Sequence, residues 1–86
     1  MYDYETQKQK ILTDSGQRMF LAIREHTWSL LKNAGAARMQ EIMHGAGSGD
    51  SWTMLACVDH LVELGEIKEL TQKGSVDGHH RVFVGA

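Results

Sequence analysis

The stretch from Ser51 to Thr71 constrains the fold most, because its hydrophobic period changes once, at a glycine. Asp50 and Ser51 precede the apolar run, and either side chain can cap the first turn of a helix. The apolar residues that follow recur at the spacing of one helix face: Leu55, Val58, Leu61 and Val62. Gly65 can adopt the left-handed backbone that ends a helix. The residues after it predict a short strand at 66–71, so the stretch is interpreted as helix, stop and strand.

Length and composition limit the kinds of protein this can be. The 86 residues suffice for one domain with a small core, and 42% apolar with 23% charged residues is typical of a globular chain. No apolar run approaches the roughly 20 residues that cross a bilayer. The polar N-terminus does not resemble a signal peptide, and a single cysteine is compatible with a reducing compartment. We therefore expect a cytoplasmic protein with no membrane partner.

The charge is unevenly distributed along the chain. Residues 1–43 carry six Lys/Arg and five Asp/Glu, whereas residues 44–86 carry three and six. This distribution excludes a general binder of polyanions.

A long helix is predicted before the central stretch. A cluster of capping residues at 13–16 begins it, and it runs to Ala34. Leu21 and Trp28, seven residues apart, lie on a different face from its main apolar stripe, and a helix apolar on two faces is usually covered on two sides. Residues 2–13, as a short helix or an arm, or a second subunit could supply the second cover. We expect a homodimer with Leu21 and Trp28 in its interface.

The segments on either side of the central stretch predict the other secondary-structure elements of the domain. Residues 36–37 leave room for one strand pairing, residues 38–44 predict a helix, and the glycine-rich residues 45–49 predict a turn. Residues 80–84 predict a returning strand, because they are rich in β-branched and aromatic residues. The order of three helices and a hairpin is that of a winged helix. We interpret residues 1–16 as an N-terminal arm or short helix that could support dimerisation, and residues 17–86 as the domain.

Three segments resemble the winged helix-turn-helix DNA-binding domains of prokaryotic transcriptional regulators, in the broad sense that includes the MarR-like and ArsR-like groups. Met39–Met43 is similar to the positioning helix, and Val58–Ile67 to the end of the recognition helix and the first wing strand. Lys73-Gly74 with Arg81–Val84 is similar to the wing. The resemblance covers roughly residues 17–85. It implies an α+β, mainly helical fold with a three-helix core, a C-terminal β-hairpin wing and an extra N-terminal segment. It also implies double-stranded DNA as the partner.

In such domains the recognition helix enters the major groove while the wing contacts the backbone or the minor groove. The resemblance therefore implies DNA contacts from Arg38, Ser51, Trp52, Thr53, Ala56, His60, Lys73, His79, His80 and Arg81. Thr53 and His60 can hydrogen-bond base edges, and Ala56 can meet a thymine methyl group. The recognition helix carries no Arg or Lys, so its share of phosphate neutralisation is small.

Two functions remain open. One is a small homodimeric transcriptional regulator that binds DNA, and the other is a winged-helix protein–protein interaction module without DNA binding. The acidic balance of residues 44–86 favours the second. Trp52 is either a recognition or partner residue, or a residue that folds over the glycine-rich turn. We expect no metal, no cofactor and no catalysis, because the histidines and Cys57 lack the spacing of metal ligands and no nucleophile has a paired base.

Overall fold

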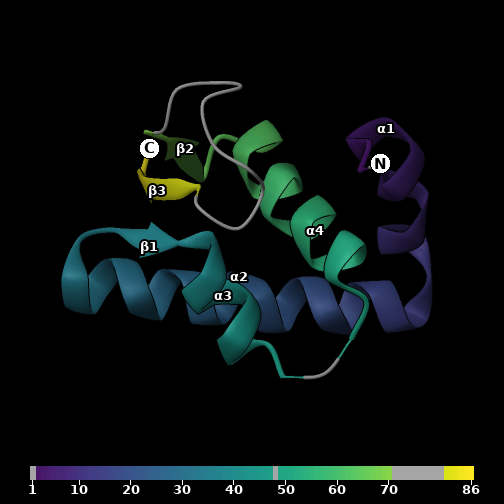
Figure 1. Ribbon diagram of the computed structural model, residues 1–86, viewed down its shortest axis with the longest axis horizontal. Coiled ribbons are helices and arrows are strands. Elements are labelled where there is room, and N and C mark those ends of the chain that lie inside the picture. Colours follow the sequence, from purple (N-terminus) through teal and green to yellow (C-terminus); the bar gives the residue numbers. More distant parts are fainter. Residues whose placement is uncertain (1, 48, 71–80) are drawn as a thin grey trace.

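The computed structural model describes residues 2–47, 49–70 and 81–86, which form a mostly helical α+β fold with a small antiparallel sheet (Figure 1). The predicted α+β, mainly helical class is confirmed. The elements follow in this order: α1 (Tyr4–Gln7), the 3-10 helix η1 (Lys8–Leu12), α2 (Asp14–Ala34), β1 (Ala37–Arg38), α3 (Met39–Gly45), α4 (Ser51–Glu63), β2 (Ile67–Glu69) and β3 (Val82–Gly85).

The predicted stop after the central helix is confirmed. The Asp50 carboxylate caps α4 by accepting a hydrogen bond from the Trp52 amide, with 3.1 Å between Oδ1 and N. Gly65 follows the helix with φ of 80°, the left-handed conformation that a glycine adopts without a Cβ clash. The strand after it, β2, is shorter than predicted, and β3 begins at Val82 rather than at residue 80. The local signals therefore located both ends of α4.

The N-terminal residues fold as helical turns rather than as an extended arm. Both α1 and η1 contact α4, and η1 also contacts α2, near whose N-terminal end they lie (Figure 1). Ile11 of η1 is only 2% exposed and belongs to the same core as α2 and α4. These residues do not cover Leu21 and Trp28, which stay 58% and 42% exposed.

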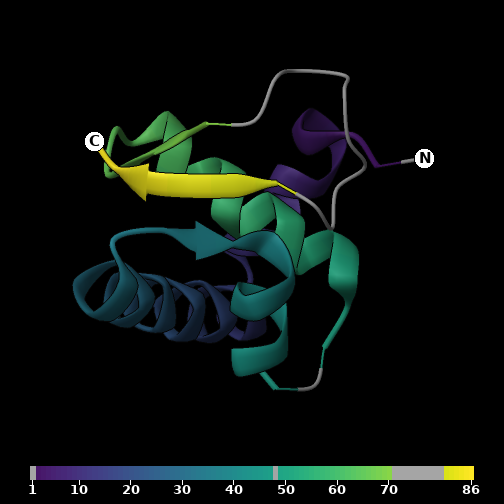
Figure 2. The same ribbon diagram turned by 60° about the vertical axis from the view of Figure 1, so that its left-hand side comes forward.

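The sheet has the order β1-β3-β2, and all its pairings are antiparallel (Figure 2). Ala37 pairs with Phe83, and Ile67 with Gly85. Since directly paired residues point to the same face, Ala37, Phe83 and Ile67 together face the helices, and all three are buried. The other face carries Arg38, Val82, Val84 and Lys68.

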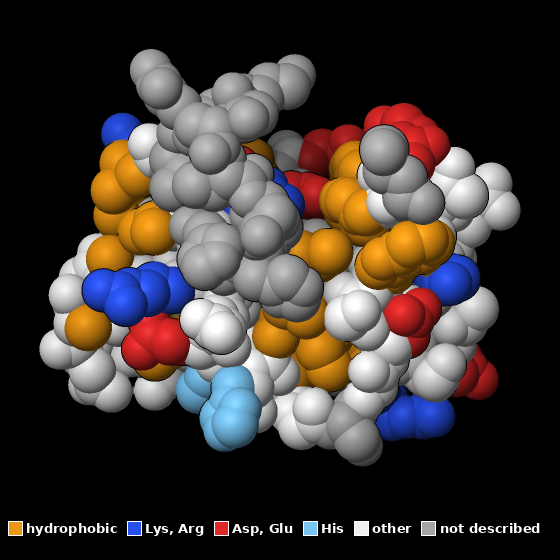
Figure 3. All heavy atoms as spheres, in the orientation of Figure 1, with side chains coloured by type: hydrophobic (Ala, Val, Ile, Leu, Met, Phe, Trp, Pro, Cys, Tyr) orange, Lys and Arg blue, Asp and Glu red, His pale blue; other side chains and the backbone are white. Residues whose placement is uncertain are grey.

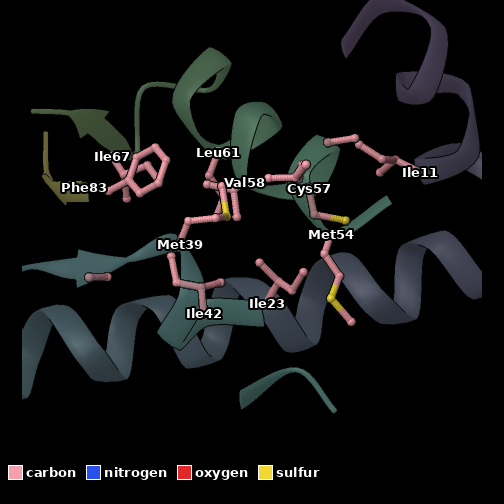
Figure 4. Packing of buried hydrophobic residues seen from close by; sticks show 13 residues of the cluster. Ile11, Ile23, Met39, Ile42, Met54, Cys57, Val58, Leu61, Ile67 and Phe83 are labelled. Carbon is pink, nitrogen blue, oxygen red and sulfur yellow. The ribbon is translucent and has the colours of Figure 1, made fainter. Parts of the chain in front are cut away.

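Helix α4 is the centre of the core. Residues 53–58 are all buried, as is Leu61, because α4 packs against α1, η1, α2, α3 and β2. Figure 4 shows Val58 and Leu61 between the sheet residues Phe83 and Ile67 on one side and Ile23 on the other. Burial of each large apolar side chain contributes about 1.5–3 kcal/mol. A helix that is apolar nearly all round must be covered nearly all round, and the N-terminal turns supply part of that cover.

Candidate functional site

The outer face of α4 is the surface at which the sequence predicts DNA contacts, and two of its residues are not at the surface. Thr53 is 7% exposed and Ala56 is fully buried, so the expectation that they face solvent is wrong. The Thr53 hydroxyl donates a hydrogen bond to Asp50 Oδ2 at 3.0 Å and thereby supports the helix cap. Threonine and alanine fit either surface or core, so the helical period alone did not show that other elements cover them.

The C-terminal half of this face is bound by the N-terminal segment. The Tyr2 hydroxyl donates to Asp59 Oδ2 at 2.5 Å, and the Tyr4 hydroxyl donates to Glu63 Oε1 at 3.1 Å. The Tyr4 hydroxyl also lies 3.2 Å from His60 Nδ1. His60, expected to reach a base edge, is therefore engaged within the chain.

Ionic and electrostatic effects reinforce this closure. Lys8 Nζ lies 2.8 Å from Glu63 Oε1, and its hydrogen bond lowers the pKa of Glu63. Burial and a hydrogen bond to Asp59 raise the pKa of Tyr2, while burial and a hydrogen bond to Glu63 raise the pKa of Tyr4. Both tyrosines are thus held as neutral donors to carboxylates of α4.

Arg81 is not a free phosphate ligand, contrary to what the resemblance implies. It stands two residues before Phe83, on the face of the β3 chain that points toward α4. Its Nη2 lies 2.6 Å from Asp59 Oδ1 and 2.8 Å from Glu69 Oε1, and its Nε donates to Glu69 Oε2 at 3.1 Å. Its side chain is only 16% exposed, and the guanidinium lies 5.1 Å from the centre of the Phe83 ring. Burial alone would lower the pKa of Arg81, but the hydrogen bonds to Glu69 and Asp59 raise it.

The other predicted site residues differ in how the structure places them. Arg38, Ser51 and Trp52 are exposed, with Trp52 at 40%. The predicted wing residues Lys73, His79 and His80 lie outside the described residues.

Cys57 is fully buried, and burial raises its pKa to about 12. Within the described ranges no group of three or more His, Cys, Asp or Glu could hold a metal ion.

The described basic residues divide into two groups. Lys8, Lys10, Arg24 and Arg81 each form an ion pair with a carboxylate of α4 or of the residues flanking it. Arg18, Lys32, Arg38 and Lys68 are exposed and form no ion pair in the part of the chain that the structure describes. Where Figure 3 shows the surface around α1 and α4, hydrophobic and acidic side chains are visible.

A second exposed surface lies on α2, and Glu66 organises it. Glu66 Oε1 accepts hydrogen bonds from Arg24 Nε at 2.8 Å and from Trp28 Nε1 at 3.0 Å. These two bonds lower the pKa of Glu66. Sequence reasoning missed Glu66, whose only signal was an acidic residue directly after the glycine that ends α4.

The described helices include none with both the length and the apolar character needed to cross a bilayer. No family model, curated protein or solved structure gives a significant match to the chain.

Proposed function

We propose that this chain is a winged-helix protein that works as a protein–protein interaction module and does not use α4 to read DNA. The order α2, β1, α3, α4, β2, β3, with a β1-β3-β2 sheet, supports a winged helix. The N-terminal turns α1 and η1 are an addition to that arrangement.

The observation that carries the proposal is that the chain's own N-terminal segment binds the C-terminal half of the outer face of α4, at Asp59, His60 and Glu63. A recognition helix needs free donors and acceptors that reach base edges in the major groove. On α4, Thr53 is buried and His60 is bonded to Tyr4, while Asp59 is bonded to Tyr2 and Arg81. With no Lys or Arg on the helix, a DNA backbone approaching it would meet carboxylates instead.

Exposed aromatic and aliphatic side chains support contact with protein. Leu21, Trp28 and Trp52 are large apolar residues with 40% or more of their surface exposed. Tryptophan is enriched among the residues that dominate protein–protein binding energy. Leu21 and Trp28 lie on one face of α2, and exposed apolar residues that lie together on a small protein usually mark an interface.

The test is a titration with mixed-sequence DNA duplexes at low and at moderate salt, followed through the indole N–H signals of the two tryptophans by NMR. We expect no shift of either signal and no salt-dependent binding. Trp28→Phe and Trp52→Phe variants assign the two signals. Saturable binding in which signals from α4 shift would overturn the proposal.

A second candidate function, DNA binding through the sheet rather than through α4, is favoured by one observation. Arg38 pairs with Val82 and Lys68 with Val84, so the two cations lie on the same outer face of the sheet, and neither forms an ion pair among the described residues. On this side of the molecule hydrophobic side chains lie between two groups of Lys/Arg (Figure 3).

The same titration separates this candidate from the first. If DNA binds the sheet, Arg38→Ala and Lys68→Ala should each lower the salt slope of binding by about one unit. The control is Arg18→Ala, which removes another exposed cation, from α2, and should leave the slope unchanged. Equal effects of all three substitutions would indicate attraction by overall charge and would exclude a site on the sheet.

A further inference from the structure

The exposed face of α2 carries four residues in one stripe, which we call the α2 stripe: Leu21, Arg24, Glu25 and Trp28. Their spacings of three, four and seven place them on one side of the helix. All four are exposed, although Ile23 and Thr27, which lie between them in the sequence, are fully buried. The stripe therefore points away from the core, and it stays largely open to solvent although Glu66 contacts Arg24 and Trp28.

Two members of the stripe are already held in one conformation. Glu66 fixes the Arg24 guanidinium through Nε and the Trp28 indole through Nε1. The hydrogen-bonding atom of Trp28 is thus satisfied within the chain, and its exposed ring offers apolar surface. Arg24 keeps free N–H groups, because a guanidinium has five donors. Side chains that are ordered before binding lose less entropy when a partner docks.

Two copies of the stripe that run antiparallel are complementary to each other, because each charge then lies opposite a charge of the other sign. In one direction it runs apolar, cation, anion, apolar, and in the other it runs apolar, anion, cation, apolar. We propose that the α2 stripe is the interface of a homodimer, in which a second copy packs its α2 antiparallel across a two-fold axis between Arg24 and Glu25. Each Leu21 then meets the partner's Trp28, and each Arg24 meets the partner's Glu25.

A two-fold axis requires the same patch on both copies, and the stripe meets this requirement without any other element. The pairing extends toward both ends of α2, where the exposed Gln17 lies opposite the partner's Lys32. A partner of unrelated sequence would need a matching pattern of its own, whereas a second copy supplies the pattern by symmetry. This inference rests on the proposed function, because it names a second copy of the chain as the partner.

The first experiment measures self-association by sedimentation equilibrium for the full chain and two matched variants. Leu21→Lys should raise the dimer dissociation constant at least about 100-fold, because the substitution enters the interface twice. Ala22→Lys is the control, since Ala22 is the next residue and is also exposed, but it lies about 100° round the helix. It should leave the constant unchanged. Leu21 is already exposed, so neither substitution disturbs the core.

The second experiment tests the antiparallel orientation with a short bismaleimide crosslinker. Glu25→Cys places the substituted position beside the axis, so the two copies should be crosslinked there. Asp14→Cys is the matched variant, because position 14 lies on the same side of α2, two turns before Leu21. In the antiparallel dimer two such cysteines are about 30 Å apart and should not be crosslinked. Cys57 does not compete, because it is fully buried.

A full chain that stays monomeric at every concentration, equal effects of Leu21→Lys and Ala22→Lys, or crosslinking through position 14 rather than 25 would each overturn the dimer. These outcomes are distinguishable from failure of the proposed function. If a dimer forms and binds DNA through α4, the proposed function is wrong but the dimer interface is supported. If the chain is a monomer that does not bind DNA, the dimer interface is wrong but the proposed function is not contradicted.

Discussion

Arg81 joins the sheet to α4 by a pair of carboxylates. Its guanidinium contacts Asp59 on the helix and Glu69 on β2 while lying over the Phe83 ring. The Asp59 and Glu69 side chains are 17% and 27% exposed, so both charges are partly removed from water. Such a cluster is stabilising only while all its members are present, because each charge compensates the desolvation of the others.

We predict that Arg81→Met lowers the free energy of unfolding by about 2–4 kcal/mol, because two partly buried carboxylates lose their cation. Arg81→Lys should recover part of this loss, since an ammonium group cannot bind both carboxylates as a planar guanidinium does. Urea denaturation at neutral pH measures both values. Lys68→Met on the outer face of β2 is the control and should change stability by less than about 0.5 kcal/mol. An Arg81→Met protein as stable as the unchanged chain would contradict the cluster's role.

At the scale of elements, the junction of η1 and α2 holds the N-terminal turns against the domain. The Thr13 hydroxyl accepts a hydrogen bond from Gly16 N at 3.0 Å and so caps α2. Gly16 is buried where η1 passes over the first turn of α2, and a Cβ added there would lie 1.9 Å from the Lys10 carbonyl oxygen. This close approach places Ile11 in the core and brings α1 onto α4.

Gly16→Ala should therefore destabilise the protein by about 2–4 kcal/mol, because backbone atoms rather than flexible side chains would have to move. Gly35→Ala separates crowding from backbone conformation, since Gly35 has φ of 78° but no atom within 4 Å of an added Cβ. It should cost only about 1 kcal/mol. Thermal unfolding of both variants gives the comparison. Equal losses would mean that the close packing of η1 on α2 does not hold the segment in place.

For the whole molecule, the dependence of stability on pH reports the closure of α4. The raised pKa of Tyr2 and Tyr4 means that the folded chain holds their protons more tightly than the unfolded chain. The two tyrosines contribute fully to the free energy of unfolding below about pH 10, the ordinary tyrosine pKa. Their contribution decreases as the pH rises above that value. The lowered pKa of Asp50, Glu63 and Glu66 has the opposite sign, so their contribution is lost as the pH falls through the acidic range.

We predict that the urea midpoint of the unchanged chain decreases between about pH 9 and pH 11, and that a Tyr2→Phe, Tyr4→Phe double variant has a lower midpoint at neutral pH but a shallower decrease. The reason is that phenylalanine has no proton to lose and no hydrogen bond to give Asp59 or Glu63. A series of urea titrations across this range measures both slopes. Parallel curves for the two proteins would show that the hydroxyls do not link the N-terminal segment to α4.

The sequence by itself determined the course of the chain from one element to the next. The Asp50 cap, the helical period of Leu55 to Val62 and Gly65 act through neighbouring residues, so they located α4 and its ends without tertiary information. The same holds for the end of α2 at Gly35, which has φ of 78°. The two apolar faces of α2 were also visible, because periodicity reveals which side chains favour burial.

Only the tertiary structure decided which surfaces are covered and by what. Tyr2 bonds Asp59 across 57 positions of sequence, and Arg24 bonds Glu66 across 42, and no local pattern specifies such partners. Thr53 and Ala56 are small enough for core or surface, so their burial depended on how the other elements pack around α4. Arg81 shares the face of Phe83 by local alternation, but its partners Asp59 and Glu69 are distant in sequence and come from α4 and β2. The helical and strand periods indicate which face of its own element a residue lies on. The charged and apolar groups that it contacts there belong to elements distant in sequence, so only tertiary packing decides them.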